Sequence, residues 1–106
     1  MEELWQKIYK VLGEHKVEKL VCYDVSQICS FTSQIIICTG TSDRQLAAVA
    51  GDVIEKVGKP AGSEGLNGAR WVLLDYVGTV VHFLLEDERA YYDLDGLWAK
   101  APRLSV

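Results

Sequence analysis

Two short apolar runs limit what this chain can fold into more than any other feature. Ile35–Cys38 and Val80–Leu85, the second interrupted by His82, contain almost nothing that prefers water. Nearly continuous apolar runs of this size are typical of strands covered on both faces of a sheet. They are much shorter than the roughly 18 residues needed for a membrane-spanning helix. We therefore expect a buried sheet and no membrane segment.

Helical and strand-like patterns alternate around these runs. A 3.6-residue period predicts helices over 3–15 and from Asp43 to about Val57, the latter capped by Thr41 or Ser42. A Gly-rich loop is expected over 61–69. The predicted strands are 19–25, 34–39, 70–75 and 79–85, and a last helix is predicted from 86 to 98. The predicted order is α-β-β-α-β-β-α.

The lengths of the connections predict how the strands pair. Residues 26–32 are too few for a parallel crossover, so the first two strands should be antiparallel neighbours. Tyr76-Val77-Gly78 should close a hairpin between the last two strands. The middle strand–helix–strand unit predicts a right-handed parallel pair of 34–39 with 70–75. The expected fold is α/β (α+β), a mixed sheet flanked by helices, in one domain spanning 1–106.

The charge distribution narrows the partners. The chain of 106 residues has a net charge of −4, and residues 64–98 hold seven carboxylates against Arg70 and Arg89. This makes free nucleic acid an unsuitable ligand, because such binding depends on Lys and Arg neutralising phosphates. A basic protein surface would be complementary; alternatively, the carboxylates only keep the protein in solution. Met1-Glu2-Glu3 has no signal-peptide pattern, so a cytoplasmic location is expected.

No group of residues predicts a metal, a cofactor or catalysis. Three cysteines without a Cys-x-x-Cys spacing are expected to be reduced structural thiols. Gly40-Thr41-Ser42 could cradle an anion but lacks the phosphate-loop and dinucleotide patterns, which favours an ordinary helix cap. A nucleotidyltransferase would need paired carboxylates on the strands that follow, and these strands offer Asp75 alone.

Strand alternation singles out one sheet face. It places Trp71, Leu73 and Asp75 together, and it places His82 with Val80 and Leu84. His82 is expected to be a hydrogen-bonded packing residue rather than a general base. Trp71 is core if helices cover this face, and with Leu73 it is the centre of an interface if the face is open. The sequence leaves both alternatives open.

Several stretches together resemble the ribosomal silencing factor family, also called Iojap-like. They occur in the family's order and spacing, from about Leu20 to Trp98. These stretches are Ile36-Ile37-Cys38-Thr39-Gly40-Thr41-Ser42, Glu64-Gly65, Trp71-Val72-Leu73-Leu74-Asp75-Tyr76, Val80-Val81-His82 and Arg89-Ala90-Tyr91-Tyr92-Asp93-Leu94-Asp95-Gly96-Leu97-Trp98.

The resemblance implies a non-enzymatic protein that binds the large ribosomal subunit through its basic fourteenth protein (uL-fourteen). Bound there, it would block joining of the small subunit and repress translation under nutrient limitation. The implied fold is nucleotidyltransferase-like without catalytic carboxylates, and a nucleotide-binding enzyme of that type is the alternative function. A homodimer off the ribosome is left open. The expected partner-binding residues are Glu64, Trp71, Leu73, Asp75, His82, Glu86, Arg89 and Tyr92.

Overall fold

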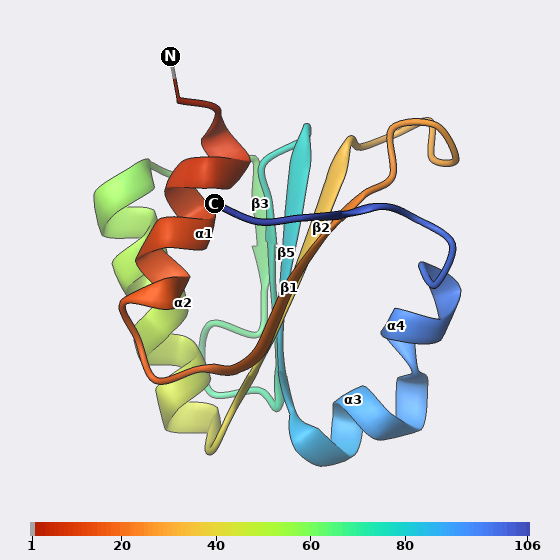
Figure 1. The fold of residues 1–106 in the computed structure, drawn as a ribbon. Coiled ribbons are helices and arrows are strands. Elements are labelled where there is room, and N and C mark those ends of the chain that lie inside the picture. The colour runs from red at the N-terminus through yellow and green to blue at the C-terminus, as the bar shows by residue number, and fades with distance from the viewer. Residues whose placement is uncertain (1) are drawn as a thin grey trace.

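A computed structural model describes residues 2–106 as a three-layer α+β fold (Figure 1). Its helices are α1 (Leu4–Gly13), α2 (Asp43–Val57), α3 (Glu86–Tyr92) and α4 (Leu94–Leu97). Its strands are β1 (Glu18–Asp24), β2 (Gln34–Gly40), β3 (Gly62–Glu64), β4 (Trp71–Asp75), β5 (Thr79–Leu85) and β6 (Arg103–Leu104). None of the helices in this range is long and apolar enough to cross a membrane.

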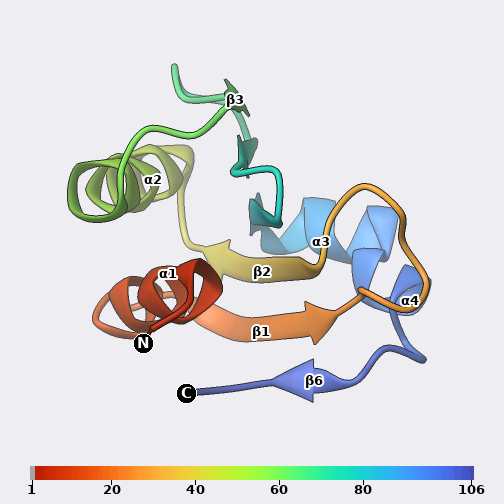
Figure 2. The same ribbon diagram turned by 90° about the horizontal axis from the view of Figure 1, so that it is seen from above.

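One mixed sheet forms the middle layer, with the strand order β3-β4-β5-β2-β1-β6. The helices α1 and α2 lie on one face, and α3 and α4 lie on the other, as the view from above shows (Figure 2). The predicted antiparallel pairing of β1 with β2 is confirmed, and so is the β4–β5 hairpin. Ser42 caps α2 as predicted, its side chain accepting a hydrogen bond from the backbone N–H of Gln45 at 3.1 Å.

The predicted parallel pair is wrong in one respect. β2 runs parallel to β5, and β4 lies one position further out, antiparallel to β5. The reason is burial: β5 is apolar on both faces, so it takes the central place beside β2, whereas β4 has a half-exposed face. After α2 the chain therefore enters the sheet at its edge as β3, two positions beyond the place beside β2, and returns inward through β4 to β5.

Three elements differ from the predicted order. The Gly-rich loop contains the short edge strand β3, and residues after Ala101 add β6 beside β1. The single helix expected over 86–98 is two helices, because Asp93 adopts a left-handed backbone with φ of 49°. Asp tolerates this conformation better than most residues, and its carboxylate then caps α4 through the N–H of Gly96.

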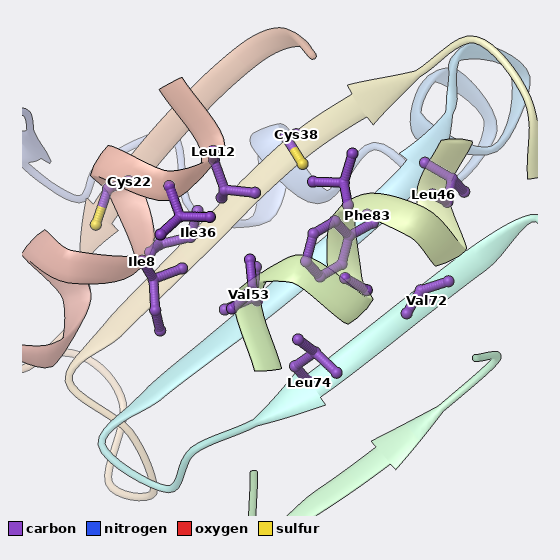
Figure 3. Packing of buried hydrophobic residues seen from close by; sticks show 14 of the residues in the cluster. Ile8, Leu12, Cys22, Ile36, Cys38, Leu46, Val53, Val72, Leu74 and Phe83 are labelled. Atoms are coloured by element: carbon purple, nitrogen blue, oxygen red, sulfur yellow. The ribbon is translucent and has the colours of Figure 1, made fainter. Parts of the chain in front are cut away.

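The main core lies between the sheet and the α1–α2 layer (Figure 3). The apolar face of α1, including Ile8 and Leu12, packs against Ile36 of β2, and α2 covers the inward side chains of β4 and β5. Val72 and Leu74 point into this core. Alternation therefore directs Trp71, Leu73 and Asp75 to the opposite face, as predicted.

A smaller apolar cluster lies on that opposite face. Tyr23, Ile35, Ile37 and Leu84 are buried at its centre, with Trp71, Leu73, Leu94 and Trp98 only partly covered. The helices α3 and α4 are short and do not extend over β3 and the outer part of β4 (Figure 2). The face is therefore closed over β1 and β2 and open over β4, which positions the candidate site.

Candidate functional site

A groove follows the open face of β4 and β5. It consists of two adjoining cavities of about 300 and 310 Å³ that share Leu73 and His82. We call them together the β4–β5 groove. The first is lined by Glu64, Trp71, Leu73 and His82, and the second by Phe31, Ile35, Leu73, Asp75, Val80, His82, Leu94, Leu97 and Trp98. The groove is mostly apolar, with acidic side chains at its margins.

Strand register brings the central residues together. Leu73 of β4 lies opposite Glu64 of β3 on one side and opposite His82 of β5 on the other. These three side chains therefore form a row across the sheet, although 18 positions separate the first from the last in the chain. Cross-strand neighbours lie about 5 Å apart and act as one surface.

Trp71 is held by two contacts. Its indole Nε1–H donates a hydrogen bond to Nδ1 of His82 at 3.1 Å. Its ring centroid lies 4.9 Å from that of Tyr92 on α3, a spacing typical of favourable aromatic pairs. Tyr92 itself is 54% exposed. Trp71 is half-buried. Its two contacts fix the orientation of the side chain, and its exposed part is accessible to a partner.

His82 is neutral at physiological pH. Burial lowers the pKa of its imidazole to about 4, because the charged form would lose its hydration. The prediction of a hydrogen-bonded packing residue is confirmed by its contact with Trp71. Its place in both cavities also puts it at the surface of the groove.

The two margin carboxylates differ in their surroundings. Glu64 is exposed on the edge strand β3. Asp75 ends β4, and its Oδ1 accepts a hydrogen bond from the backbone N–H of Val77 at 2.8 Å. This bond supports the hairpin turn, where Val77 has a φ of 72°. Since Glu64 has no ion pair among residues 2–106 and neither does Asp75, both can receive a basic partner.

Arg89 does not reach this surface, which corrects its expected role as a partner contact. Its side chain is 8% exposed and binds Asp95 at 2.9 and 3.0 Å. It also donates to the carbonyl oxygen of Lys19 and to Oγ1 of Thr39. A guanidinium with these bonds holds α3 and α4 to the sheet and is not free to bind a partner.

Glu86 is also separate from the groove. It lies at the start of α3, where its carboxylate pairs with Lys19 at 2.6 Å, and it lines other cavities. Of the eight expected residues, the structure therefore brings together Glu64, Trp71, Leu73, Asp75, His82 and Tyr92.

Among the groove residues that the sequence analysis did not expect, two are large apolar side chains exposed to solvent. Phe31 is 70% exposed in the connection between β1 and β2, and Leu97 is 67% exposed on α4. Phe31 is the one aromatic residue of this connection, which was the available signal. Leu97 fitted a helical apolar period, which predicted burial. Exposed apolar side chains beside a groove are typical of protein interfaces.

The chain offers no group suited to metal binding within residues 2–106. His15, just after α1, bonds Asp52 of α2 at 2.7 Å, whereas His82 lies on the other sheet face, opposite Leu73 and in the groove. Burial raises the pKa of the Cys22 and Cys38 thiols to about 12, so neither is a nucleophile near neutral pH. In the Gly40-Thr41-Ser42 turn, the backbone N–H of Thr41 donates a hydrogen bond to Oε1 of Gln45 at 2.7 Å, so this N–H is not free to bind an anion.

Comparison with known proteins decides the family. The family model described as "Ribosomal silencing factor during starvation" matches residues 1–106. The chain belongs to this family. The family takes its name from a regulatory role rather than from a chemical reaction.

Individual relatives agree in sequence and in fold. Ribosomal silencing factors from Halalkalibacterium halodurans and Haemophilus influenzae are 36% and 40% identical, over 99% and 87% of this chain and 93% and 94% of theirs. A crystal structure of a protein from Chromobacterium violaceum has a TM-score of 0.85 and 34% identity, covering 93% of this chain and 88% of the other. The α+β fold of this chain is thus shared with a solved structure.

Proposed function

We propose that this protein is a ribosomal silencing factor that acts by binding and not by catalysis. In this proposal the β4–β5 groove docks on the basic protein uL-fourteen of the large ribosomal subunit. The bound factor then occupies the space into which the small subunit would move, so the subunits do not join and translation is repressed. The proposal includes a cytoplasmic location and one domain over residues 1–106.

The composition of the groove carries the proposal. Its centre is an aromatic and aliphatic surface formed by Trp71, Leu73 and Tyr92, with His82 as a polar group inside it. Trp and Tyr are enriched among residues that dominate binding energy, especially where they are already fixed in the free protein. Because His82 and Tyr92 hold Trp71, little rotamer freedom is lost on binding.

Charge supports a basic partner. Glu64 and Asp75 stand at the margins of the apolar centre without ion-pair partners within residues 2–106. The other carboxylates of this half of the chain are largely engaged: Asp95 pairs with Arg89, and Glu88 pairs with Arg70. Negative charge at the rim of an apolar surface steers a basic protein and fixes its orientation.

The nucleotidyltransferase alternative gains no support from the site. The strands after the Gly40-Thr41-Ser42 turn carry two carboxylates, Glu64 on β3 and Asp75 on β4, and they line different cavities. Oδ1 of Asp75 also serves the hairpin turn. The turn itself caps α2. A two-metal mechanism requires converging carboxylates, and the part of the chain that the structure describes holds no cluster of three or more His, Cys, Asp or Glu suited to a metal ion.

The test is binding to purified large subunits by co-sedimentation, followed by subunit joining measured in sucrose gradients. We expect wild-type protein to co-sediment and to reduce joining. Trp71→Ala and Asp75→Ala should weaken both, whereas Glu55→Gln, which alters an exposed carboxylate of α2, should not. Folded Trp71→Ala and Asp75→Ala proteins that still bind like wild type would overturn the groove as the docking site.

Oligomeric state is a separate expectation. A homodimer off the ribosome stays a prediction, which light scattering coupled to gel filtration checks across a range of protein concentrations. If the groove were also the dimer contact, Trp71→Ala would shift the protein toward the monomer.

A further inference from the structure

The two ring nitrogens of His82 have different surroundings. Nδ1 receives the indole Nε1–H of Trp71 at 3.1 Å. Nε2 has no hydrogen-bond partner among residues 2–106. Within that range, Oε1 of Glu88 is the one side-chain atom that is both fully buried and unpartnered, so Nε2 of His82 is accessible. Nε2 is therefore reached from the groove, which His82 lines in both of its cavities.

The contact with Trp71 fixes where the imidazole carries its proton. An indole N–H can only donate, so Nδ1 must present its lone pair. A neutral imidazole with a lone pair on Nδ1 carries its hydrogen on Nε2. Trp71 thereby selects one of the two neutral tautomers, and the selected one offers a hydrogen-bond donor to the groove.

We propose that His82 is a specificity-determining contact that donates a hydrogen bond from Nε2–H to a carbonyl oxygen of the docked partner, and that Trp71 is the residue that positions this donor. The inference rests on the proposed function. The proposal predicts two kinds of group on the partner's surface, cationic side chains and a carbonyl acceptor. Lys and Arg side chains have no acceptor and belong opposite Glu64 and Asp75, whereas a main-chain or amide carbonyl belongs opposite His82.

The energetic reason is the cost of leaving a polar group unpaired. When the partner covers the groove, Nε2–H loses water, and without an acceptor it would stay buried and unsatisfied. A partner that offers an apolar or cationic group at this point is rejected, so the histidine discriminates among partners even where its own net contribution to affinity is modest.

Two variants separate hydrogen bonding from packing. His82→Leu keeps an apolar side chain and loses both nitrogens, and we expect about a tenfold loss of affinity for large subunits. His82→Gln keeps an acceptor for Trp71 and an N–H donor for the partner, and we expect it to bind clearly better than His82→Leu. Equal affinities for both variants, with both folded by circular dichroism, would overturn the partner contact.

Nitrogen-15 NMR of the histidine rings tests the tautomer without any ribosome. We expect an unprotonated Nδ1 and a protonated Nε2 for His82, assigned with a His15→Gln variant because the chain has two histidines. Trp71→Phe keeps a ring but removes the donor, and it should produce a mixture of tautomers. A hydrogen on Nδ1 in the wild-type protein would overturn the positioning role of Trp71.

The same spectrum with purified uL-fourteen tests the contact directly. Binding should protect the His82 Nε2–H proton from exchange with water, while an unprotected proton in a formed complex would overturn the contact. If the protein binds large subunits but not uL-fourteen, the named partner is wrong, and the affinities of the Leu and Gln variants for subunits still decide the contact. If it binds no subunits, the proposed function and the contact fail together, whereas the tautomer is still decided in the free protein.

Discussion

Arg89 and Asp95 form a bidentate ion pair across the break between α3 and α4. Nε and Nη2 of the arginine contact the two carboxylate oxygens at 2.9 and 3.0 Å. The hydroxyl of Tyr23 on β1 donates to the same carboxylate at 2.7 Å, and Arg89 donates to Oγ1 of Thr39 on β2. This pair, buried on its Arg89 side, thus ties both short helices to the sheet, and with them Tyr92, which contacts Trp71.

Breaking this pair should destabilise the fold. Asp95→Ala leaves the largely buried Arg89 guanidinium without its carboxylate, and the expected loss is about 3 kcal/mol of unfolding free energy. Urea unfolding followed by circular dichroism measures it. The matched control is Glu86→Ala, which removes one side of the exposed Lys19–Glu86 pair and should change stability by about 0.5 kcal/mol or less. Equal losses in the two variants would contradict a structural role for Arg89.

How far the sequence predicts this molecule follows from which interactions are local. Periodicity depends on each segment's own residues, and it predicted α1, α2, the hairpin and the shared face of Trp71, Leu73 and Asp75 correctly. The order of strands depends on competition for the buried centre. Thus β5, which is apolar on both faces, displaced β4 from the position beside β2.

The candidate site shows the same limit. Its central row needs the register between β3, β4 and β5, and no local pattern contains that register. The strand β3 is a short, exposed edge segment without apolar alternation, so its residues were predicted to be part of a loop. Arg89 looked like a surface charge because its partners Asp95, Lys19 and Thr39 come from three separate parts of the chain.

The stability of the fold should depend on pH through His82. Folding lowers the pKa of this imidazole from its ordinary value of 6.5 to about 4. The unfolded chain therefore binds more protons between these values, and stability falls as pH drops through this window, by about 3 kcal/mol in total. Urea unfolding between pH 7 and 4 measures the loss, and His82→Gln should remove most of it. A similar slope in that variant would assign the effect to other groups.

Trp71 should matter more for binding than for folding. Phe83 lies on the other face and is completely buried, so Phe83→Ala should cost about 3–5 kcal/mol of stability. Trp71 is half-buried, so Trp71→Ala should cost less than Phe83→Ala in the same urea titration. Its affinity for large subunits should nevertheless fall by about 30-fold or more, as expected for an aromatic residue at the centre of an interface. The reverse ranking would make Trp71 a core residue.

The purified protein should neither bind nor turn over nucleotides with Mg²⁺. The reason is that no cluster of three or more His, Cys, Asp or Glu suited to a metal ion occurs within residues 2–106, and that Oδ1 of Asp75 is engaged by the hairpin turn. Equilibrium dialysis with labelled ATP and assay of phosphate or pyrophosphate release measure the two properties. Turnover that disappears in Asp75→Asn would contradict this prediction and favour the nucleotidyltransferase alternative.

Binding to large subunits should weaken as salt rises, and Glu64 should account for part of this dependence. Glu64 is exposed on β3 at the margin of the groove, and ions screen exposed charges beyond about 8–10 Å at physiological ionic strength. Glu64→Gln should lower affinity at low salt and flatten the salt dependence, because one steering charge is lost. Glu55→Gln changes the net charge equally but lies on α2, across the sheet from the groove, so its salt dependence should follow the wild type. Co-sedimentation at several salt concentrations measures all three proteins. If Glu55→Gln flattened the curve as much as Glu64→Gln, net charge rather than the groove would steer binding.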